Sequence, residues 1–329
     1  MGERRWSMAR VGALLAALVC TVVIAACGGS SGGGGKGKPA TLKVGVIPIA
    51  DVSPLYVGIK KGFFKAEKLT IQPRLAPGGA AIVASVVSGE DQIGFSNTTS
   101  LLIANSKNVP VKLISQGVLG AAKPTPTQAW DAVLVKKNSS IKTAKDLEGK
   151  TVSVNTLQNV GPLTINTALK NHGADYKKVK YAEVQFPDAL GALNTGRVDA
   201  IWEVEPFVSL AKSQGDRVIF YPFEETAPHL TVATYFTTKQ YASQNSDVVD
   251  RFVRAMNKSL DYAQSHPADV RKVVPTYTKI PPAAAQHMNL PQWQADLNRP
   301  TIEKQAALAK TYGFLTKSPD LNDLIRQQP

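Results

Sequence analysis

The sequence predicts an α/β fold built from two similar lobes, and three observations support this prediction. Segments typical of strands alternate with segments typical of helices from about residue 41 to residue 221. The stretches SGEDQIGF (88–95) and TGRVDAIW (195–202) start 107 residues apart and share a turn glycine before an apolar strand, although chance similarity of two βα units would also explain this. A chain of 329 residues, 43% of them hydrophobic, is about long enough for two domains.

Ten short apolar or β-branched segments have the composition of strands. They are 41–47, 69–76, 92–95, 111–117, 131–137, 151–155, 179–184, 199–202, 217–221 and 231–239. Because strands that alternate with helices usually pair in parallel, we expect parallel sheets covered on both faces. The last strand is expected to return to the first lobe. We therefore assign 41–115 to the first lobe, 116–230 to the second, and 231–329 to the return and the C-terminal helices, with the connections near 115–131 and 221–234.

The segments between these strands have helical patterns. They are 53–64, 80–89, 97–106, 161–173, 187–196 and 206–215. A long amphipathic helix is expected over 246–267, capped by Ser246 and ended by Pro267. The rest of the chain is expected to be helical, with a turn at Pro281 and Pro282.

The N-terminus has the pattern of an export signal. Three arginines precede sixteen uncharged residues, VGALLAALVCTVVIAA, which is short for a membrane span but suits a signal peptide over 1–26. The run ends in IAAC, which resembles a bacterial lipobox with Cys27 as the lipidated residue. An ordinary cleaved signal and an uncleaved anchor are the alternatives. Residues 27–40, rich in glycine, are expected to form a flexible tether.

Composition excludes several classes of function. Cys20 and Cys27 are the only cysteines, so the exported domain lacks a disulfide and a thiolate metal site. The four histidines have no metal-ligand spacing, and no metal or cofactor is expected. The net charge of +13 comes from scattered lysines and arginines rather than a basic cluster with aromatics, so we expect attraction to anionic lipid or cell wall and no nucleic acid.

One long stretch resembles a known family. SPLYVGIKKGFFKAEKLTIQPRLAPGGAAIVASVVSGEDQIGFSN (53–97) is similar to the opening of the nitrate, sulfonate, taurine and thiamine-precursor (SsuA/THI5-like) binding proteins of ABC importers, and LNTGRVDAIWEVEPF (193–207) resembles the family's second-lobe segment. The resemblance covers about residues 41–265. It implies the type II periplasmic-binding-protein fold, in which two lobes joined by crossing strands close over a small molecule. It also implies permease subunits as partners, an extracytoplasmic location and a monomer.

The candidate binding residues lie where predicted strands end, because open parallel sheets bind ligands at the carboxyl ends of their strands. They are Asp51, Ser53, Gly78, Gly79, Ser96, Asn97, Thr98, Thr156, Gln158, Asn159, Gly161, Trp202, Glu203 and Glu205. Helix N-termini in these loops favour an anionic or accepting group on the ligand. The two glutamates favour a donor group, and Trp202 offers a flat face. A taurine-like sulfonate fits best, with an aminopyrimidine or an aromatic acid as alternatives.

Structural roles are the alternative for each of these residues. Trp202 has the size of a core residue, and Glu203 and Glu205 precede a helix that Pro206 would start. Asn97 is equally suited to capping a helix, and Gly78 with Gly79 to a tight turn. An enzyme related to the pyrimidine synthases is a further alternative, with the two glutamates as its acid–base pair, and a structural or adhesive protein is another.

Overall fold

The structure, a computed structural model, describes residues 37–327 of the chain. The predicted signal peptide and Cys27 lie outside the described residues. Within the described residues, none of the helices combines the length and the apolar character that crossing a membrane requires.

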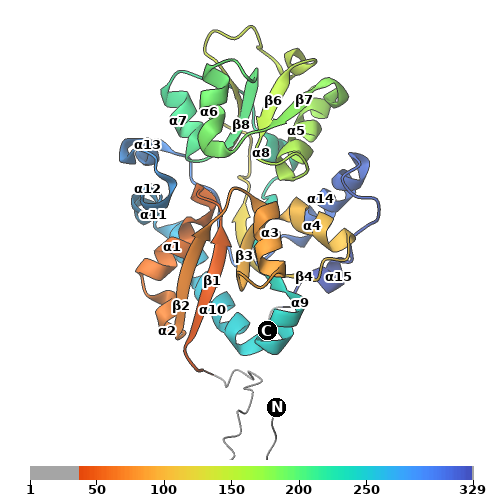
Figure 1. Ribbon diagram of the computed structural model, residues 1–329. Coiled ribbons are helices and arrows are strands. Elements are labelled where there is room, and N and C mark those ends of the chain that lie inside the picture. Colours follow the sequence, from red (N-terminus) through yellow and green to blue (C-terminus); the bar gives the residue numbers. More distant parts are fainter. Residues whose placement is uncertain (1–36, 328–329) are drawn as a thin grey trace, which may run out of the picture. The chain divides into compact units, whose positions relative to one another are not determined.

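Between residues 37 and 327, ten strands form two five-stranded sheets (Figure 1). The first sheet has the order β2-β1-β3-β10-β4 and consists of β1 (Ala40–Val46), β2 (Leu69–Leu75), β3 (Ile93–Asn97), β4 (Val111–Leu119) and β10 (Thr231–Thr238). The second has the order β7-β6-β8-β5-β9 and consists of β5 (Asp131–Val135), β6 (Thr151–Val154), β7 (Lys180–Glu183), β8 (Ala200–Val204) and β9 (Arg217–Phe220). Each strand overlaps one of the predicted segments.

The expectation of purely parallel sheets is wrong, because each sheet contains one reversed strand. β10 is antiparallel to β3 and β4, and β5 is antiparallel to β8 and β9. These are the two strands that the chain enters directly from the other sheet. An apolar pattern reports burial but not strand direction, so the reversal leaves no local signal.

Helices flank both sheets. They are α1 (Ser53–Lys60), α2 (Phe63–Ala66), α3 (Gly79–Val87), α4 (Thr98–Ser106), α5 (Val160–Asn171), α6 (Phe186–Asn194), α7 (Phe207–Ser213), α8 (Pro222–Thr226), α9 (Lys239–Gln244), α10 (Ser246–Ser265), α11 (Pro267–Val273), α12 (Pro275–Thr278), α13 (Pro282–His287), α14 (Arg299–Thr311) and α15 (Leu321–Leu324). Short 3₁₀ turns lie at η1 (Ala50–Val52), η2 (Ala144–Leu147) and η3 (Tyr176–Lys178).

The long helix α10 ends before Pro267, as predicted, but its start differs. The residue at the N-cap is Asn245 rather than Ser246, and no side chain there accepts a capping hydrogen bond. The C-terminal region is also less helical than predicted. Between α13 and α14 the chain is irregular, and Gln292 forms an isolated β-bridge with Leu119 at the end of β4.

Candidate functional site

The carboxyl ends of both sheets meet at a small cavity of about 30 Å³. Its lining comes from the turn after β1, from the residue after β6, from β3, β8 and β10, and from the starts of α5, α6 and α8. The lining residues are Ile47, Ile49, Asp51, Phe95, Asn97, Asn155, Asn159, Val160, Phe186, Trp202, Val204, Phe223, Val232 and Ala233. Within this lining no lysine, arginine or histidine occurs, so the described residues offer a ligand no cationic side chain.

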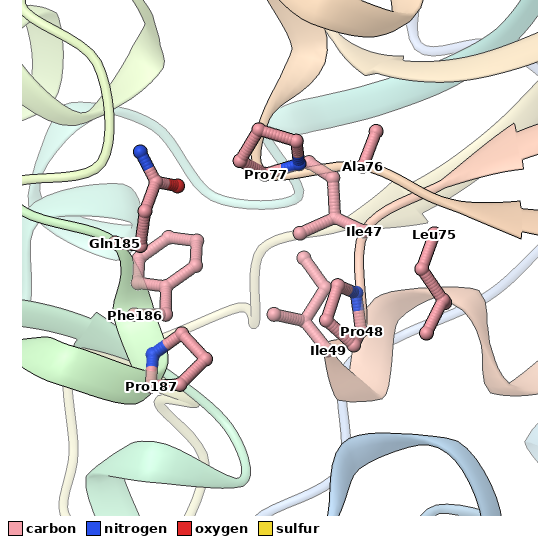
Figure 2. A pocket seen from close by; sticks show the side chains of 9 residues that line it. All are labelled: Ile47, Pro48, Ile49, Leu75, Ala76, Pro77, Gln185, Phe186 and Pro187. Atoms are coloured by element: carbon pink, nitrogen blue, oxygen red, sulfur yellow. The ribbon is translucent and has the colours of Figure 1, made fainter.

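An outer groove of about 230 Å³ adjoins the cavity, and both share Ile47, Ile49 and Phe186. Figure 2 shows Gln185, Phe186 and Pro187 on one side of the groove, facing the turn after β1 and the end of β2 on the other. The shared residues make the groove an entrance to the cavity.

Four aromatic residues, Phe95, Phe186, Trp202 and Phe223, line the cavity. The ring centroids of Trp202 and Phe186 lie 5.5 Å apart, and those of Trp202 and Phe223 lie 5.7 Å apart in an edge-to-face contact. The indole Nε1 of Trp202 donates to Asp131 Oδ2 at 3.0 Å. Gly161 leaves room for the indole, since a Cβ atom there would lie 2.5 Å from the ring. The wall therefore suits a flat or apolar ligand body.

Asp51 is the acidic group of the cavity. It is 3% exposed, and its Oδ1 has no hydrogen-bond partner among the described residues. Burial raises its pKa to about 8. The turn that carries it is fixed from outside, because Trp293 Nε1 donates to the Asp51 carbonyl at 3.2 Å. A rigidly held carboxyl with a free oxygen can accept a hydrogen bond from a ligand or pair with an ammonium group.

Three asparagines supply the other polar groups. Asn97 Oδ1 accepts from Ser100 N at 2.8 Å, which confirms the capping role, and also from Val160 N at 3.3 Å at the start of α5. Asn159 Oδ1 accepts from Gly161 N at 2.9 Å, and its Nδ2 donates to Asn155 Oδ1 at 2.8 Å. The backbone N–H groups of Val160 and Gly161, at the N-terminus of α5, are therefore already bonded to asparagine side chains of the protein.

The N-terminus of α3 is different, because its N-cap residue is Gly78 and no side chain in the described part of the chain caps it. Its two glycines allow close packing: a Cβ on Gly79 would lie 2.2 Å from Ser96 Oγ, and one on Gly78 would lie 3.2 Å from Thr156 Oγ1. The side-chain amide nitrogens are the next nearest atoms: Asn97 Nδ2 would lie 3.0 Å from a Cβ on Gly79, and Asn155 Nδ2 would lie 3.4 Å from a Cβ on Gly78. Backbone and amide N–H groups therefore gather here and suit an accepting group.

The structure brings neither Glu203 nor Glu205 to the cavity. β8 continues to Val204, so side chains alternate along it, and Trp202 and Val204 face the cavity while Glu203 faces away. Glu203 is buried, neither of its carboxyl oxygens has a hydrogen-bond partner among residues 37–327, and burial raises its pKa well above the usual range. Glu205 accepts from Ser209 Oγ at 2.8 Å, Ser209 N at 3.1 Å and Asn289 N at 3.2 Å, which corresponds to the helix-start alternative.

The remaining candidates lie around the cavity rather than on its surface. Ser53 and Ser96 are buried, and Thr98 Oγ1 donates to the Thr231 carbonyl at 2.7 Å. Gln158 is exposed. Of the sequence candidates, the cavity brings together Asp51, Asn97, Asn159 and Trp202.

Sequence reasoning missed Asn155 and most of the apolar lining. Asn155 ends the predicted strand TVSVN, so its position at a strand end was a usable signal. Phe186 follows the strand at 179–184 in the same way. Apolar residues at strand ends have the same composition as core residues, so the sequence alone does not distinguish the two. No group of three or more His, Cys, Asp or Glu residues suited to a metal ion occurs in the described part of the chain.

Comparison with known proteins places this chain in a family. Residues 49–270 match the model of the family described as "NMT1/THI5 like". The chain belongs to this family. It is 27% identical over 197 residues to the taurine-binding periplasmic protein of Escherichia coli, covering 59% of this chain and 57% of that protein. It is 23% identical over 228 residues to the formylaminopyrimidine-binding protein of Halalkalibacterium halodurans, covering 68% of this chain and 65% of that protein. The match thus spans about 57–65% of the length of these relatives.

The fold is also that of a solved family structure. The alkanesulfonate-binding protein SsuA of Xanthomonas axonopodis, bound to MOPS, superposes with a TM-score of 0.73 at 18% identity, covering 88% of this chain and 99% of that one. This agreement confirms the predicted α/β periplasmic-binding-protein fold of the NMT1/THI5-like chain.

Proposed function

We propose that this protein is an extracytoplasmic substrate-binding protein, which captures a small polar organic solute between its lobes and delivers it to the permease subunits of an ABC importer. The observation that carries the proposal is the cavity between the two sheets, with aromatic walls and one carboxyl group that has a free oxygen. Similarity to binding proteins named for small solutes, one of them periplasmic, supports the same role.

The cavity chemistry favours a planar ligand that carries an amino group. Its amino group would bind Asp51, its flat body would pack against Trp202 and Phe186, and an accepting atom would face the start of α3. Full burial of a sulfonate beside these residues would leave its charge to N–H groups alone, and burying a charge without a counter-charge is costly. The aminopyrimidine alternative is therefore preferred to the taurine-like ligand that the sequence favoured.

A taurine-like sulfonate is the second candidate. The uncapped start of α3, with the amides of Asn97 and Asn155 beside Gly79 and Gly78, would receive its sulfonate oxygens. Its ammonium group would then pair with Asp51. The two ligand classes share the amino group and differ at the opposite end.

Thermal unfolding with matched compounds tests the proposal. We would compare 4-amino-2-methylpyrimidine with 2-methylpyrimidine, and taurine with ethanesulfonate, because each pair differs in the amino group. A ligand at 100 times its Kd adds about 2.7 kcal/mol to the free energy of unfolding, so binding is readily visible. We expect the amino compound of one pair to bind and its partner to bind far more weakly. Equal binding of both partners, or conversion of the compound to a product, would contradict this function.

We also place the protein at the membrane through lipid on Cys27, on the outer face of the cytoplasmic membrane. Cys27→Ser should release the protein from the membrane fraction or leave the longer precursor. The measurement is the mass of the processed chain together with its distribution after fractionation. Unchanged membrane retention at an unchanged processed mass would exclude the lipid anchor.

A further inference from the structure

The outer groove of Figure 2 is larger than the cavity that it adjoins. The groove has a volume of about 230 Å³ and the cavity about 30 Å³, so most of the connected space lies in the groove. Hydrogen bonds bridge the lobes in this conformation, since Ala50 N donates to the Glu205 carbonyl at 2.9 Å and Val160 N donates to Asn97 Oδ1 at 3.3 Å. The groove is therefore open while the two lobes are in contact.

The side chains that line the groove are almost entirely apolar. Eight of the nine lining residues are isoleucine, leucine, alanine, phenylalanine or proline, and the ninth is Gln185. The amide nitrogen of Gln185 donates to the Asn155 carbonyl at 3.4 Å, and its Oε1 is buried rather than exposed to the groove. None of the nine residues is charged, so a charged group placed in the groove would lose water without gaining a counter-charge.

The backbone of the groove is also poor in hydrogen-bond donors. Three of the lining residues are prolines, which have no N–H group. Two further N–H groups are already bonded to the protein, since Ile49 N donates to the Ile47 carbonyl at 2.9 Å and Ala76 N donates to the Val46 carbonyl at 2.9 Å. The groove therefore suits an apolar chain better than a second polar group.

Leu75 shows that the protein lines this groove without filling it. It is the last residue of β2 and is 55% exposed, which makes it one of three large hydrophobic residues exposed in the described part of the chain. Figure 2 shows Leu75 on the same side of the groove as Ile47 and Ile49, opposite Phe186. An apolar chain between these two sides would cover Leu75 and remove it from water, which favours binding.

We propose that the ligand carries a short alkyl chain on its amino-bearing head: the head occupies the cavity beside Asp51, and the chain lies in the groove. The cavity and the groove share Ile47, Ile49 and Phe186, so one ligand can span both. The head rests on the proposed function, whereas the chain rests on the groove. The ligand class is thereby narrowed to an amino compound with an apolar substituent.

A homologous series of pyrimidines tests the chain. Calorimetric titration would compare 4-amino-2-methylpyrimidine with its 2-propyl and 2-pentyl analogues, and with an analogue whose chain ends in a carboxylate. We expect affinity to rise about two- to fourfold for each added methylene, because burial of a methylene removes apolar surface from water. The carboxylate should abolish this gain. Equal affinity along the series, or an equal gain with the carboxylate, would overturn the proposal.

Leu75→Gln tests where the chain lies. Leu75 lines the groove but not the cavity, and it is exposed, so the variant should fold normally. We expect unchanged affinity for the methyl compound, and a gain for the pentyl compound that is smaller than in the wild type by about twofold or more. Val87→Gln is the matched control, since Val87 is 43% exposed and lines neither space. If Leu75→Gln keeps the full gain, the chain lies elsewhere and the proposal is wrong.

A chain without an amino head separates this proposal from the proposed function. 1-Hexanol, added in excess, should shift the methyl resonances of Leu75 and Ile47 in NMR spectra and leave those of Val87 unchanged. The resonances are identified as those missing in Leu75→Gln, Ile47→Val and Val87→Gln. Such shifts in a protein that binds neither the pyrimidines nor taurine would reject the proposed head but retain the groove as the site of an apolar chain. Unshifted Leu75 and Ile47 resonances would overturn the proposal.

Discussion

Asp51 shows how a single carboxyl group can give the cavity its polarity. It lies among aromatic and aliphatic side chains, and its Oδ1 lacks a partner among the described residues. In the empty cavity its raised pKa keeps it protonated near neutral pH. The amino group of an aminopyrimidine would donate to the free oxygen of Asp51, whereas an ammonium group would pair with the carboxylate after Asp51 loses its proton to solvent, and both interactions strengthen as water is excluded.

Asp51 and Glu203 are both buried carboxyl groups, but only Asp51 lines the cavity. Asp51→Asn should weaken binding of an amino ligand by about 10-fold or more, because a charge-assisted hydrogen bond contributes roughly 1.5–3 kcal/mol. Glu203→Gln is the matched control, since Glu203 is equally buried but faces away from the cavity on β8. The affinity of this variant for the amino ligand should be unchanged. Calorimetric titration measures both. Equal losses in the two variants would show that buried carboxyls act through stability and not through contact.

Stability should also depend on Asp51 in a defined pH window. Its pKa is raised on folding from an ordinary value of 3.8 to about 8. The folded state therefore binds the proton more tightly, and this stabilisation is complete below about pH 4 and is lost as the pH rises to about 8. Across that window this contribution to the free energy of unfolding of the wild type falls by up to about 1.4 kcal/mol per pH unit, and Asp51→Asn should remove this fall. Denaturant unfolding at several pH values measures the slope, and parallel curves for variant and wild type would contradict the assignment.

Glu205 is expected to act on stability alone. It bonds the start of α7 and the backbone of Asn289, so Glu205→Ala leaves those N–H groups without partners. We expect a loss of about 1–3 kcal/mol in the free energy of unfolding and little change in affinity. Unfolding curves and a titration with the same preparation separate the two effects. A large loss of affinity at unchanged stability would show that Glu205 contributes to ligand binding.

At the scale of elements, α5 and α3 play different parts around the cavity. α5 is capped by Asn159 and bonded across to Asn97, so its start is fixed by the protein's own side chains. α3 begins without a side-chain cap. α5 therefore supports the cavity wall, whereas α3 offers its N-terminal N–H groups to a ligand.

The fit of α5 against Trp202 is open to a direct test. Gly161→Ala would place a methyl group 2.5 Å from the indole ring, so either the helix or the ring must move. We expect a loss of about 1–3 kcal/mol in stability, together with weaker ligand binding. Gly191→Ala in α6 is the matched control, because nothing lies within 4 Å of the added atom. It should raise stability by about 0.5–1 kcal/mol, and a neutral Gly161→Ala would refute the close fit.

At the scale of the whole fold, the cavity is too small for the proposed ligands. About 30 Å³ is close to the volume of a single water molecule. The sheets are also bridged by Ala50 N, which donates to the Glu205 carbonyl at 2.9 Å, and by the bond from Val160 to Asn97. Ligand entry therefore requires the two halves to separate along the groove of Figure 2 and to close again.

Small-angle X-ray scattering measures this motion. We expect the radius of gyration to fall when a saturating amino ligand is added, because the open form closes over it. Asp51→Asn provides the control, because its weaker binding should require about 10-fold more ligand for the same fall. An identical scattering curve with and without ligand in the wild type would argue against closure between the lobes.

Local sequence patterns alone determined the number of strands, their positions along the chain, the helices between them and the α/β class. Periodicity and turn residues report burial and backbone conformation over a few neighbours, and these are local properties. They also placed Asp51, Asn97, Asn159 and Trp202 at strand ends, since strand ends are visible in the sequence.

Only the tertiary structure decided which groups meet. The reversed direction of β5 and β10 depends on pairing between distant segments, and the face that Glu203 occupies depends on β8 continuing two residues further than its apolar pattern indicated. The hydrogen bond from Trp202 Nε1 to Asp131, 71 positions apart, likewise follows from the pairing of β5 with β8. Such contacts are set by the packing of whole sheets, and no local pattern of residues carries that information.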